Sequence, residues 1–267
     1  MNSHDAHIEG PDLAALAGLL ADGTRAGFCL ALLDGRAWTA TELARHAGVA
    51  ASTTTEHLNL LVEGGLLSQE RHGRHRYVRL ADPETAELIE TLASRAPRRP
   101  APPSSLSAVN RNRALADART CYDHLAGALG VAITDAMTQK GMLDWERGLT
   151  LTADGTAWLA ELGIAQQSAT RRPPVRSCLD WTERRPHLAG AVGAALCTHA
   201  FDSGWIKRIG TSRAVALTDL GRHALRDHLR LSDDIRAPLP ALHPHPPAGA
   251  RTAAPRSGPG PVVGGRT

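Results

Sequence analysis

Residues 39–80 read TATELARHAGVAASTTTEHLNLLVEGGLLSQERHGRHRYVRL, and they begin with two short helical patterns. Thr39 and Glu42 have the spacing of a capping box, so a helix is expected to start here. Gly48 predicts the turn that follows, because glycine readily adopts the left-handed conformation that ends a helix. A second helix is predicted over about residues 51–63, where apolar side chains share one arc and polar side chains the other.

The hydrophobic period changes after this second helix. Residues 66–80 predict two short strands around the tight-turn sequence His72-Gly73-Arg74. Asp82-Pro83 then predicts the start of a last helix, and two further helical patterns precede residue 39. The order helix, helix, helix–turn–helix, hairpin, helix is that of a winged helix. We therefore expect a mainly α fold with small β-hairpin wings.

The second helix and the hairpin carry features that suit DNA. Small hydroxyl side chains at the start of a helix allow close approach to a major groove and offer hydrogen bonds to phosphates and base edges. The hairpin concentrates arginine, whereas the rest of residues 12–95 is net acidic. Alternate residues of a strand share a face, so two hairpin arginines can meet a phosphate backbone together. The expected DNA-binding residues are Ser52, Thr53, Thr55, Glu56, His57, Arg74 and Arg76.

Each of these features has a second interpretation. Many three-helix bundles contain a helix–turn–helix shape, and an arginine-rich hairpin can be a sheet edge protected against aggregation. Glu56 can be the capping-box partner of Thr53 instead of reading a base, and we favour that interpretation for this side chain. A winged helix that contacts only other proteins is therefore kept as an alternative.

Composition divides the chain of 267 residues into four segments. A proline-rich stretch over residues 96–106 predicts a linker between a winged helix-turn-helix domain, residues 8–95, and a second folded domain, residues 107–231. Residues 232–267 are rich in proline, glycine and alanine and lack apolar periodicity, which predicts a disordered tail.

Charge and cysteine usage narrow the class of protein. The net charge is only +3, so a case for nucleic-acid binding depends on where the arginines lie. No long apolar run and no secretory leader pattern are found, which predicts a cytoplasmic protein without a membrane partner. The cysteines are widely separated and form no CxxC pair, which predicts reduced thiols. They are Cys29, Cys121, Cys178 and Cys197.

A set of short motifs over residues 20–80 resembles the ArsR-type winged-helix transcriptional regulators. The matching motifs are Asp22-Gly23-Thr24-Arg25, Glu42-Leu43-Ala44, His57-Leu58 with Leu61, Gly65-Leu66-Leu67, and Arg71, Gly73-Arg74 and Tyr77. The resemblance implies a homodimer, more in keeping with a repressor than an activator, that binds pseudo-palindromic double-stranded DNA and leaves it when an effector arrives. This chain has Thr55 and Glu56 where the family usually has a serine and a basic residue.

The resemblance also bears on metal binding. Many members of the family bind metal through cysteines on the helix before the recognition helix, or through acidic and histidine ligands on the last helix. The corresponding segments here are TELARHAG and PETAELIETLASR, neither of which contains a cysteine. His46 alone cannot form a site. Neither of these two metal sites is expected, and the sequence assigns no cofactor with certainty.

The second folded segment contains a faint internal repeat. Both MLDWERGLTLTADG, from Met142, and WIKRIGTSRAVALTDLG, from Trp205, contain a strand-like stretch, a Leu-Thr pair, a glycine and a helix pattern. This repetition predicts winged-helix-like units. The segment is also similar to extended ArsR-type regulators, through TCYDHLAG and through CLDW followed by ERRPHLAG. The resemblance does not identify a ligand.

Those two similar segments hold the candidate sensor residues. Cys121 and His124 lie three apart on a predicted helix and hence on one face. Thiolate and imidazole suit zinc or another borderline-soft metal, and neighbouring arginines could instead lower a thiol pKa. The same residues could also line a pocket for a small-molecule effector, or the cysteines could be ordinary buried residues of the core. The candidate set is Cys121, His124, Cys178, Asp180, His187 and Cys197.

The sequence contains no recognisable catalytic pattern. It has no nucleophile–base pair at a familiar spacing, no glycine-rich phosphate loop and no HExxH motif. We therefore expect a DNA-binding regulator that is not an enzyme. A protein-interaction module and a thiol- or metal-responsive sensor are kept as competing hypotheses.

Overall fold

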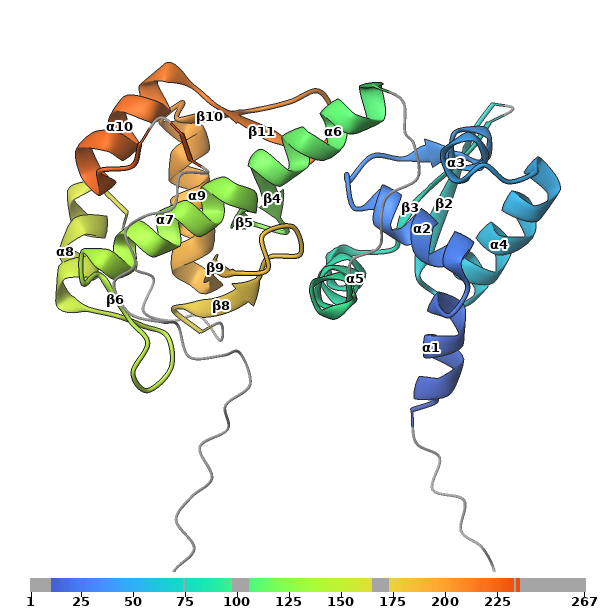
Figure 1. Cartoon of the computed structure of the whole chain (residues 1–267), viewed down its shortest axis with the longest axis horizontal. Helices are drawn as coiled ribbons and strands as arrows, with labels where there is room; N and C mark the ends of the chain where they lie inside the picture. Colours follow the sequence, from blue (N-terminus) through green and yellow to red (C-terminus); the bar gives the residue numbers. More distant parts are fainter. Residues whose placement is uncertain (1–10, 74, 98–105, 165–172, 233, 236–267) are drawn as a thin grey trace, which may run out of the picture.

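The computed structural model describes residues 11–73, 75–97, 106–164, 173–232 and 234–235. Two separate apolar cores form in it, one within the N-terminal region (residues 11–97) and one within the C-terminal region (residues 106–235). Figure 1 shows the two regions with α5 at the side of the N-terminal region that faces the other. Most of the predicted linker and of the predicted tail lie outside the described residues, so these two predictions stay untested.

The N-terminal region has the predicted winged-helix element order. Its three-stranded antiparallel sheet has the order β1-β3-β2. The expectation of a mainly α fold with small β-hairpin wings is confirmed. The elements are α1 (Leu13–Leu20), α2 (Gly23–Leu32), β1 (Trp38–Thr39), α3 (Ala40–Ala47), α4 (Ala51–Glu63), β2 (Leu67–His72), β3 (His75–Leu80) and α5 (Pro83–Arg95).

Local capping defines the helix–turn–helix. The Glu42 backbone N–H donates to Thr39 Oγ1 over 3.2 Å, and the Thr39 N–H donates to Glu42 Oε2 over 2.7 Å, so the predicted capping box is confirmed. Gly48 ends α3 in the left-handed conformation, with φ of 68°. The next helix, α4, begins at Ala51 and ends at Glu63, as the sequence predicted.

The core of the N-terminal region lies between α2, α3, α4 and the sheet. Aromatic residues are scarce in this chain, so leucine supplies most of its volume. Burying one leucine side chain completely stabilises a fold by roughly 1.5–3 kcal/mol. The side chains that are almost fully buried here include Phe28, Leu32, Leu43, Leu58, Leu61 and Val78.

The C-terminal region begins with a helix and then repeats one pattern twice, hairpin–helix–hairpin–helix. The expected plan of a hairpin followed by a helix is confirmed in both copies. Thr152 and Thr218 occupy equivalent places and cap the last helix of each copy. The elements are α6 (Leu106–Asp117), then β4 (Arg119–Cys121), β5 (His124–Ala126), α7 (Gly127–Gln139), β6 (Leu143–Asp144), β7 (Thr150–Leu151) and α8 (Ala153–Glu161), then β8 (Arg176–Leu179), β9 (Pro186–Ala189), α9 (Gly190–Asp202), β10 (Ile206–Arg208), β11 (Val215–Leu217) and α10 (Asp219–Leu229).

The two copies pack against each other around a local two-fold relationship. A Cβ atom added to Gly130 on α7 would lie 2.4 Å from the Leu125 carbonyl oxygen and 3.7 Å from the Cβ atom of His187 in the other copy. A Cβ atom on Gly193, the equivalent residue of α9, would lie 2.6 Å from the Leu188 carbonyl oxygen and 3.3 Å from the Cβ atom of His124. Glycine is required at both positions mainly because a Cβ atom would clash with the carbonyl of the preceding strand in the same copy, and the two histidine-bearing hairpins pack directly over these glycines.

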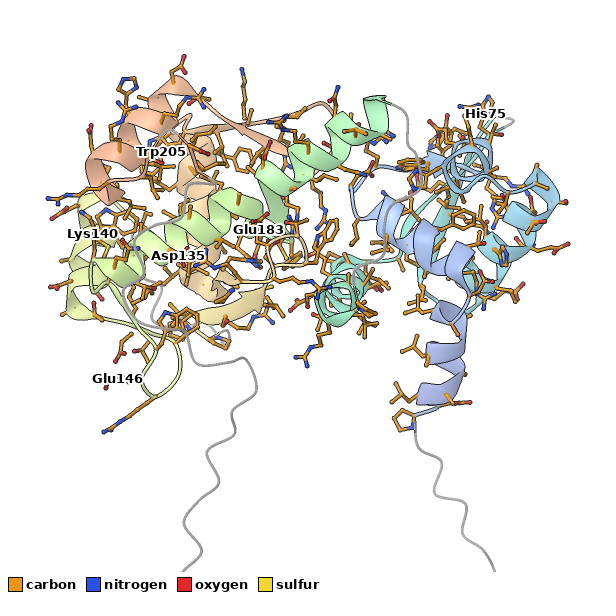
Figure 2. All side chains as sticks on the ribbon, viewed as in Figure 1. His75, Asp135, Lys140, Glu146, Glu183 and Trp205 are labelled. Atoms are coloured by element: carbon orange, nitrogen blue, oxygen red, sulfur yellow. The ribbon has the colours of Figure 1, made fainter. Side chains whose placement is uncertain are left out.

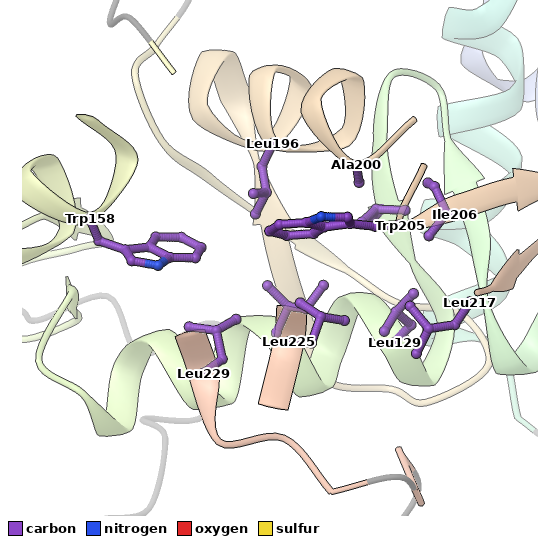
Figure 3. A pocket seen from close by; sticks show the side chains of 11 residues that line it. Leu129, Trp158, Leu196, Ala200, Trp205, Ile206, Leu217, Leu225 and Leu229 are labelled. Atoms are coloured by element: carbon purple, nitrogen blue, oxygen red, sulfur yellow. The ribbon is translucent and has the colours of Figure 1, made fainter. Parts of the chain in front are cut away.

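The apolar core of the C-terminal region surrounds Trp205. Figure 3 shows its indole ring between Leu196 and Ala200 on one side and Leu225 on the other. The cavity that remains has a volume of about 10 Å³, which is at the lower limit for one water molecule. This space is therefore packed core and not a pocket for a small-molecule effector.

Ion pairs connect the two regions through α5. Arg176 Nη1 lies 2.6 Å from Glu87 Oε1, and Arg213 Nη2 lies 2.6 Å from Glu90 Oε1. Arg213 also donates from Nε to the Leu33 carbonyl oxygen over 2.7 Å, and Trp181 packs against the N-terminal core. The last helix of the winged helix is thus held by the C-terminal region.

No single helix in the described ranges is both long enough and apolar enough to span a membrane; α1 and α2 meet these criteria only when taken together, and they meet at an angle of 84°.

Candidate DNA interface and a buried cysteine–histidine cluster

The first turns of α4 present small polar side chains at the surface. Ser52, Thr55 and Glu56 are exposed, Thr53 is half-buried and Thr54 is buried. The Thr55 hydroxyl donates to the Ala51 carbonyl oxygen over 2.9 Å, within its own helix, and its oxygen can still accept a hydrogen bond. This surface can therefore approach a groove closely while offering polar contacts.

The interpretation of Glu56 as a capping partner of Thr53 is wrong. Helix α4 has Ala50 at its N-cap, with no side-chain capping bond. Thr53 lies inside the first turn of the helix, so it cannot serve as the residue that precedes it. The exposed Glu56 carboxylate therefore stays on the expected DNA-facing surface.

The structure places His57 differently from the other predicted DNA-binding residues. Its Nδ1 atom lies 3.4 Å from Arg25 Nη1, and its Nε2 atom lies 3.9 Å from Asp22 Oδ1. Its ring also meets the edge of Phe28. His57 therefore contacts the start of α2, and it is not part of the exposed polar surface with Ser52 and the two threonines beside it.

The wing is joined to α4 through Arg76, which donates from Nη1 to Asn59 Oδ1 over 2.8 Å. Arg76 lies two residues before the buried Val78 on β3 and so shares its face, which places the stem of Arg76 on the inner face of the hairpin. Sequence analysis missed Asn59, although its place one helical turn after Thr55 on the polar arc was a signal. Arg74 lies outside the described residues.

The wing tip carries exposed basic side chains. Arg71 and His72 at the end of β2 and His75 at the start of β3 are exposed, and Figure 2 shows His75 at this tip. Glu70 pairs with Arg79 across the hairpin and lies 3.5 Å from His72 Nε2. Glu70 thus offsets the positive charge of Arg79 near the root of the hairpin. Net positive charge remains at the wing tip.

A second candidate site lies in the C-terminal region, where four of the candidate sensor residues form a cluster. Their ligand atoms all lie within 4.8 Å of one another. Cys121 faces His124 across the β4–β5 hairpin, and Cys178 faces His187 across the β8–β9 hairpin. The cysteine and the histidine of each copy are therefore cross-strand partners.

The prediction that Cys121 and His124 share a helix face is wrong. The segment is a tight hairpin in which Tyr122 adopts the left-handed conformation, with φ of 57°. Pairing of the two strands overrides the helical tendency of such a short segment. The two side chains end up opposite each other, which is closer than a helix would bring them.

The polar atoms of the cluster are ordered around its centre. His124 Nε2 lies 3.1 Å from His187 Nε2, and Cys121 Sγ lies 4.0 Å from Cys178 Sγ. Each histidine directs its other nitrogen to an aspartate of its own hairpin. The Nδ1–carboxylate distance is 3.2 Å for His124 to Asp123, a hydrogen bond, and 3.4 Å for His187 to Asp180, where no hydrogen bond is formed.

Asp180 is a positioning residue beside the cluster. It is fully buried and accepts hydrogen bonds from Arg119 Nη2 over 2.9 Å and from the Gly127 backbone N–H over 2.7 Å. Burial alone would raise the pKa of Asp180, but the Arg119 guanidinium and His187 outweigh it and hold that pKa below its usual range. Asp180 is thus a fixed negative charge beside His187.

Cys197 is not brought to this cluster. It packs in the apolar core, where burial raises the pKa of its thiol to about 12. The contact with Cys178 and burial likewise hold the pKa of the Cys121 thiol well above its usual value, which is opposite to the lowering by nearby arginines that the sequence left open. The structure therefore gives no thiol activated by arginine at these two positions.

The cluster touches α5 of the winged helix. Cys121 Sγ lies 2.7 Å from Glu90 Oε2, and the Glu90 side chain is buried. Glu90 is the same carboxylate that pairs with Arg213. Sequence analysis missed Glu90 as a site residue. The available signal was its place one helical turn from both Ala86 and Ser94, small residues on the inward face of α5.

A shallow hollow lies next to this contact, between the wing and the β4–β5 turn. It has a volume of about 340 Å³, and Arg79, Pro83, Tyr122 and Arg213 are among the residues that line it. This volume is in the range of small-molecule sites, so the hypothesis of a small-molecule effector stays a prediction.

The helix–turn–helix, the polar start of α4 and the basic wing together define a DNA-binding winged-helix regulator. Residues 20–70 match a family model described as a helix-turn-helix domain. The chain is 42% identical over 224 residues to the HTH-type transcriptional regulator YdfF of Bacillus subtilis strain 168, across 83% of this chain and 98% of that relative. This chain belongs to the helix-turn-helix transcriptional regulators, and its winged helix is of the ArsR type, as the sequence predicted.

Solved structures similar to part of the chain include two mycobacterial proteins. One is the homodimeric winged helix-turn-helix domain of a possible ArsR-family regulator from Mycobacterium bovis, with 29% identity and a TM-score of 0.28, covering 30% of this chain and 72% of that one. The other is the cadmium sensor CMTR of Mycobacterium tuberculosis, with 32% identity and a TM-score of 0.29, covering 35% of this chain and 99% of that one.

Proposed function

We propose that this chain is a cytoplasmic homodimeric repressor that binds operator DNA and leaves it when an effector binds its C-terminal region. The observation that carries the proposal is the exposed polar start of α4 beside a basic wing that is hydrogen-bonded to the same helix through Arg76 and Asn59. A helix and a β-ribbon joined in this way can contact one duplex as a unit.

The major-groove contacts are assigned to the first turns of α4. Ser52, Thr53, Thr55 and Glu56 supply the polar groups that read base edges or position the helix against phosphates. Arg74 and Arg76 bind the backbone from the wing, and binding therefore weakens as salt rises. His57 acts indirectly, by fixing α4 against α2.

Exposed leucines support the homodimer. Leu13 of α1 is 72% exposed, and Leu88 and Leu92 on α5, one helical turn apart, are 38% and 45% exposed. We expect a second copy to cover these side chains and to bring its own α4 helix to the same face of the dimer. Two helices can then enter successive major grooves about 34 Å apart, so the operator is expected to be a pseudo-palindrome.

The contacts support a division of labour between the two regions. Residues 8–95 serve as the DNA-binding domain and residues 107–231 as the regulatory domain, which acts on α5 through Arg176 and Arg213. This role requires neither a catalytic step nor a membrane. The competing function is a winged helix that contacts only proteins. That function gives no reason for the exposed hydroxyl side chains at the start of α4.

The test is binding of the full chain to DNA from upstream of its own gene, followed by fluorescence anisotropy. We expect binding that weakens steeply with salt and a loss of sequence preference in a Ser52→Ala/Thr55→Ala double variant. Thr211→Ala, an exposed threonine in the loop between β10 and β11, is the matched control and should bind normally. If the folded dimer causes no rise in DNA anisotropy at low salt, the proposal is refuted and a winged helix that contacts only proteins is favoured.

A further inference from the structure

We propose that Cys121, His124, Cys178 and His187 bind one borderline-soft divalent metal ion, with zinc the best fit, and that this ion regulates DNA binding through Glu90. The metal site itself stands on the geometry of the C-terminal region. Only its effect on DNA rests on the proposed function above.

The spacing of the four ligand atoms fits a tetrahedral centre. Zinc binds imidazole nitrogen at about 2.0–2.1 Å and thiolate sulfur at about 2.3 Å, so tetrahedral neighbours lie about 3.3 Å apart for two nitrogens and about 3.8 Å apart for two sulfurs. The Nε2–Nε2 distance is 3.1 Å between His124 and His187, and the Sγ–Sγ distance is 4.0 Å between Cys121 and Cys178. Small adjustments complete the geometry, whereas a disulfide would need sulfurs about 2.05 Å apart.

The tautomers of the two histidines leave their lone pairs at the centre. His124 Nδ1 lies at hydrogen-bond distance from Asp123, which places its proton on that nitrogen. His187 Nδ1 is buried 3.4 Å from the Asp180 carboxylate without forming a hydrogen bond, and the nearby negative charge favours a proton on this nitrogen too. Both Nε2 atoms then present lone pairs to each other inside the protein. A cation between them satisfies both, and a carboxylate behind each imidazole is the usual outer partner of a metal-bound histidine.

The donor set selects the kind of metal. Two sulfurs and two imidazole nitrogens favour zinc and related metals over magnesium or calcium, which prefer oxygen ligands. Cys121, His124 and His187 are almost fully buried, which leaves little room for water ligands. Each of the two copies contributes one cysteine and one histidine from opposite strands of a hairpin, so the ion joins the copies along their local two-fold relationship.

Glu90 couples the site to the winged helix. As a thiol, Cys121 donates its hydrogen bond to Glu90, which also holds Arg213. Metal binding deprotonates both cysteines and releases the two protons to solvent, so Glu90 loses this donor and faces a thiolate. The contact between α5 and the C-terminal region is thereby weakened, and we expect operator affinity to fall.

The metal site is tested with cobalt(II), which substitutes for zinc and reports its ligands by absorption. The full chain, reduced and freed of metal with a chelator, should bind one equivalent and show intense tetrahedral bands together with thiolate charge-transfer absorption. Zinc should displace the cobalt and abolish the bands. Cys178→Ser should lose about half of the charge-transfer intensity, because the Cys121 thiolate remains a ligand, whereas Cys197→Ala, which removes a buried thiol outside the cluster, should keep the full spectrum.

A weak octahedral spectrum, or charge-transfer absorption that Cys178→Ser leaves at full intensity, would overturn the site. Because the wild-type spectrum is itself diagnostic, the result does not depend on the variants folding well. Circular dichroism of each variant identifies one that is unfolded.

The regulatory effect is tested in the same DNA-binding assay. One equivalent of zinc should lower operator affinity about tenfold, which is a typical allosteric coupling. Glu90→Gln should keep the cobalt spectrum but lose most of this response. If zinc-loaded wild type binds the operator with unchanged affinity, the coupling is overturned but the metal site is not. If the chain shows the tetrahedral cobalt spectrum but binds no DNA, the proposed function is refuted and the metal site still stands.

Discussion

Arg76 Nη1 on β3 lies 2.8 Å from Asn59 Oδ1 on α4, so the wing and the recognition helix are hydrogen-bonded to each other directly. The Arg76 Nε atom is buried and has no hydrogen-bond partner among the described residues. The guanidinium thus depends on Asn59 for its position. A change at Asn59 should therefore alter both stability and the angle at which the wing meets DNA.

Replacing Asn59 with alanine should lower the free energy of unfolding by about 0.5–1.5 kcal/mol, because it removes the solvent-exposed hydrogen bond that holds the Arg76 guanidinium. DNA affinity should fall as well. Asn59→Asp is the matched control: it keeps an acceptor for Arg76 and so keeps stability, but it adds negative charge at the DNA surface and weakens binding. Urea denaturation and anisotropy separate the two effects, and equal stability of wild type and Asn59→Ala would contradict this role.

Arg74→Ala should weaken binding to every DNA sequence alike and reduce the slope of log affinity against log salt by about one. The physical reason is the loss of one phosphate contact and its released counterion. Thr53→Ala should instead change base preference with little change in salt slope. A salt titration on operator and non-operator DNA checks both expectations; if affinity and slope are unchanged in Arg74→Ala, the role assigned to this wing arginine is wrong.

The exposed leucines of α5 should control assembly. Leu88→Glu/Leu92→Glu is expected to convert the dimer to a monomer, since two charges would be buried in the interface. Leu220→Glu on α10, where the leucine is 59% exposed, is the control and should leave the dimer intact. Analytical ultracentrifugation distinguishes the outcomes, and a dimer that persists in the α5 double variant rules out this interface.

The Arg119–Asp180 ion pair should be costly to break. Both side chains are fully buried, with 2.9 Å between Arg119 Nη2 and Asp180 Oδ2. Arg119→Met should lower the free energy of unfolding by about 3–5 kcal/mol, because it leaves a buried carboxylate without its partner. Exposed pairs contribute far less, so Arg222→Met, which breaks the exposed pair with Asp219, is the control in urea denaturation. Similar losses in the two variants would contradict this explanation.

Alkaline pH should destabilise the C-terminal core through Cys197. Burial raises the pKa of this thiol to about 12 in the folded chain, from 9.0, so its contribution to stability is complete below pH 9 and is lost as pH rises toward 12. The loss approaches about 1.4 kcal/mol per pH unit within that window. Urea denaturation between pH 8.5 and 10.5 should show a shallower decline in Cys197→Ala than in wild type; equal declines would contradict the shift.

Local signals made the winged helix predictable from the sequence. The capping box at Thr39 and Glu42, the left-handed glycine at 48 and the change of period at the hairpin act within a few residues, and the structure follows each of them. The polar face of α4 was predictable from local sequence in the same way. Ser52 and Thr55 are exposed because the apolar arc beside them meets the core.

Contacts between distant residues could not be predicted in this way. Cys121 and His124 were placed on a helix, and nothing in the spacing showed that they meet Cys178 and His187 about 60 residues later. The role of α5 was hidden as well. Its glutamate at 90 turns inward to the C-terminal region, while its leucine at 92 is exposed, because the partner of this helix is another part of the chain.

The reciprocal packing of Gly130 against His187 and of Gly193 against His124 has an evolutionary consequence. The two copies form what amounts to a dimer within one polypeptide, and each supplies half of the shared contact surface. A descendant that lost one copy would expose the whole contact surface of the other. Selection therefore acts on the pair as one heritable unit.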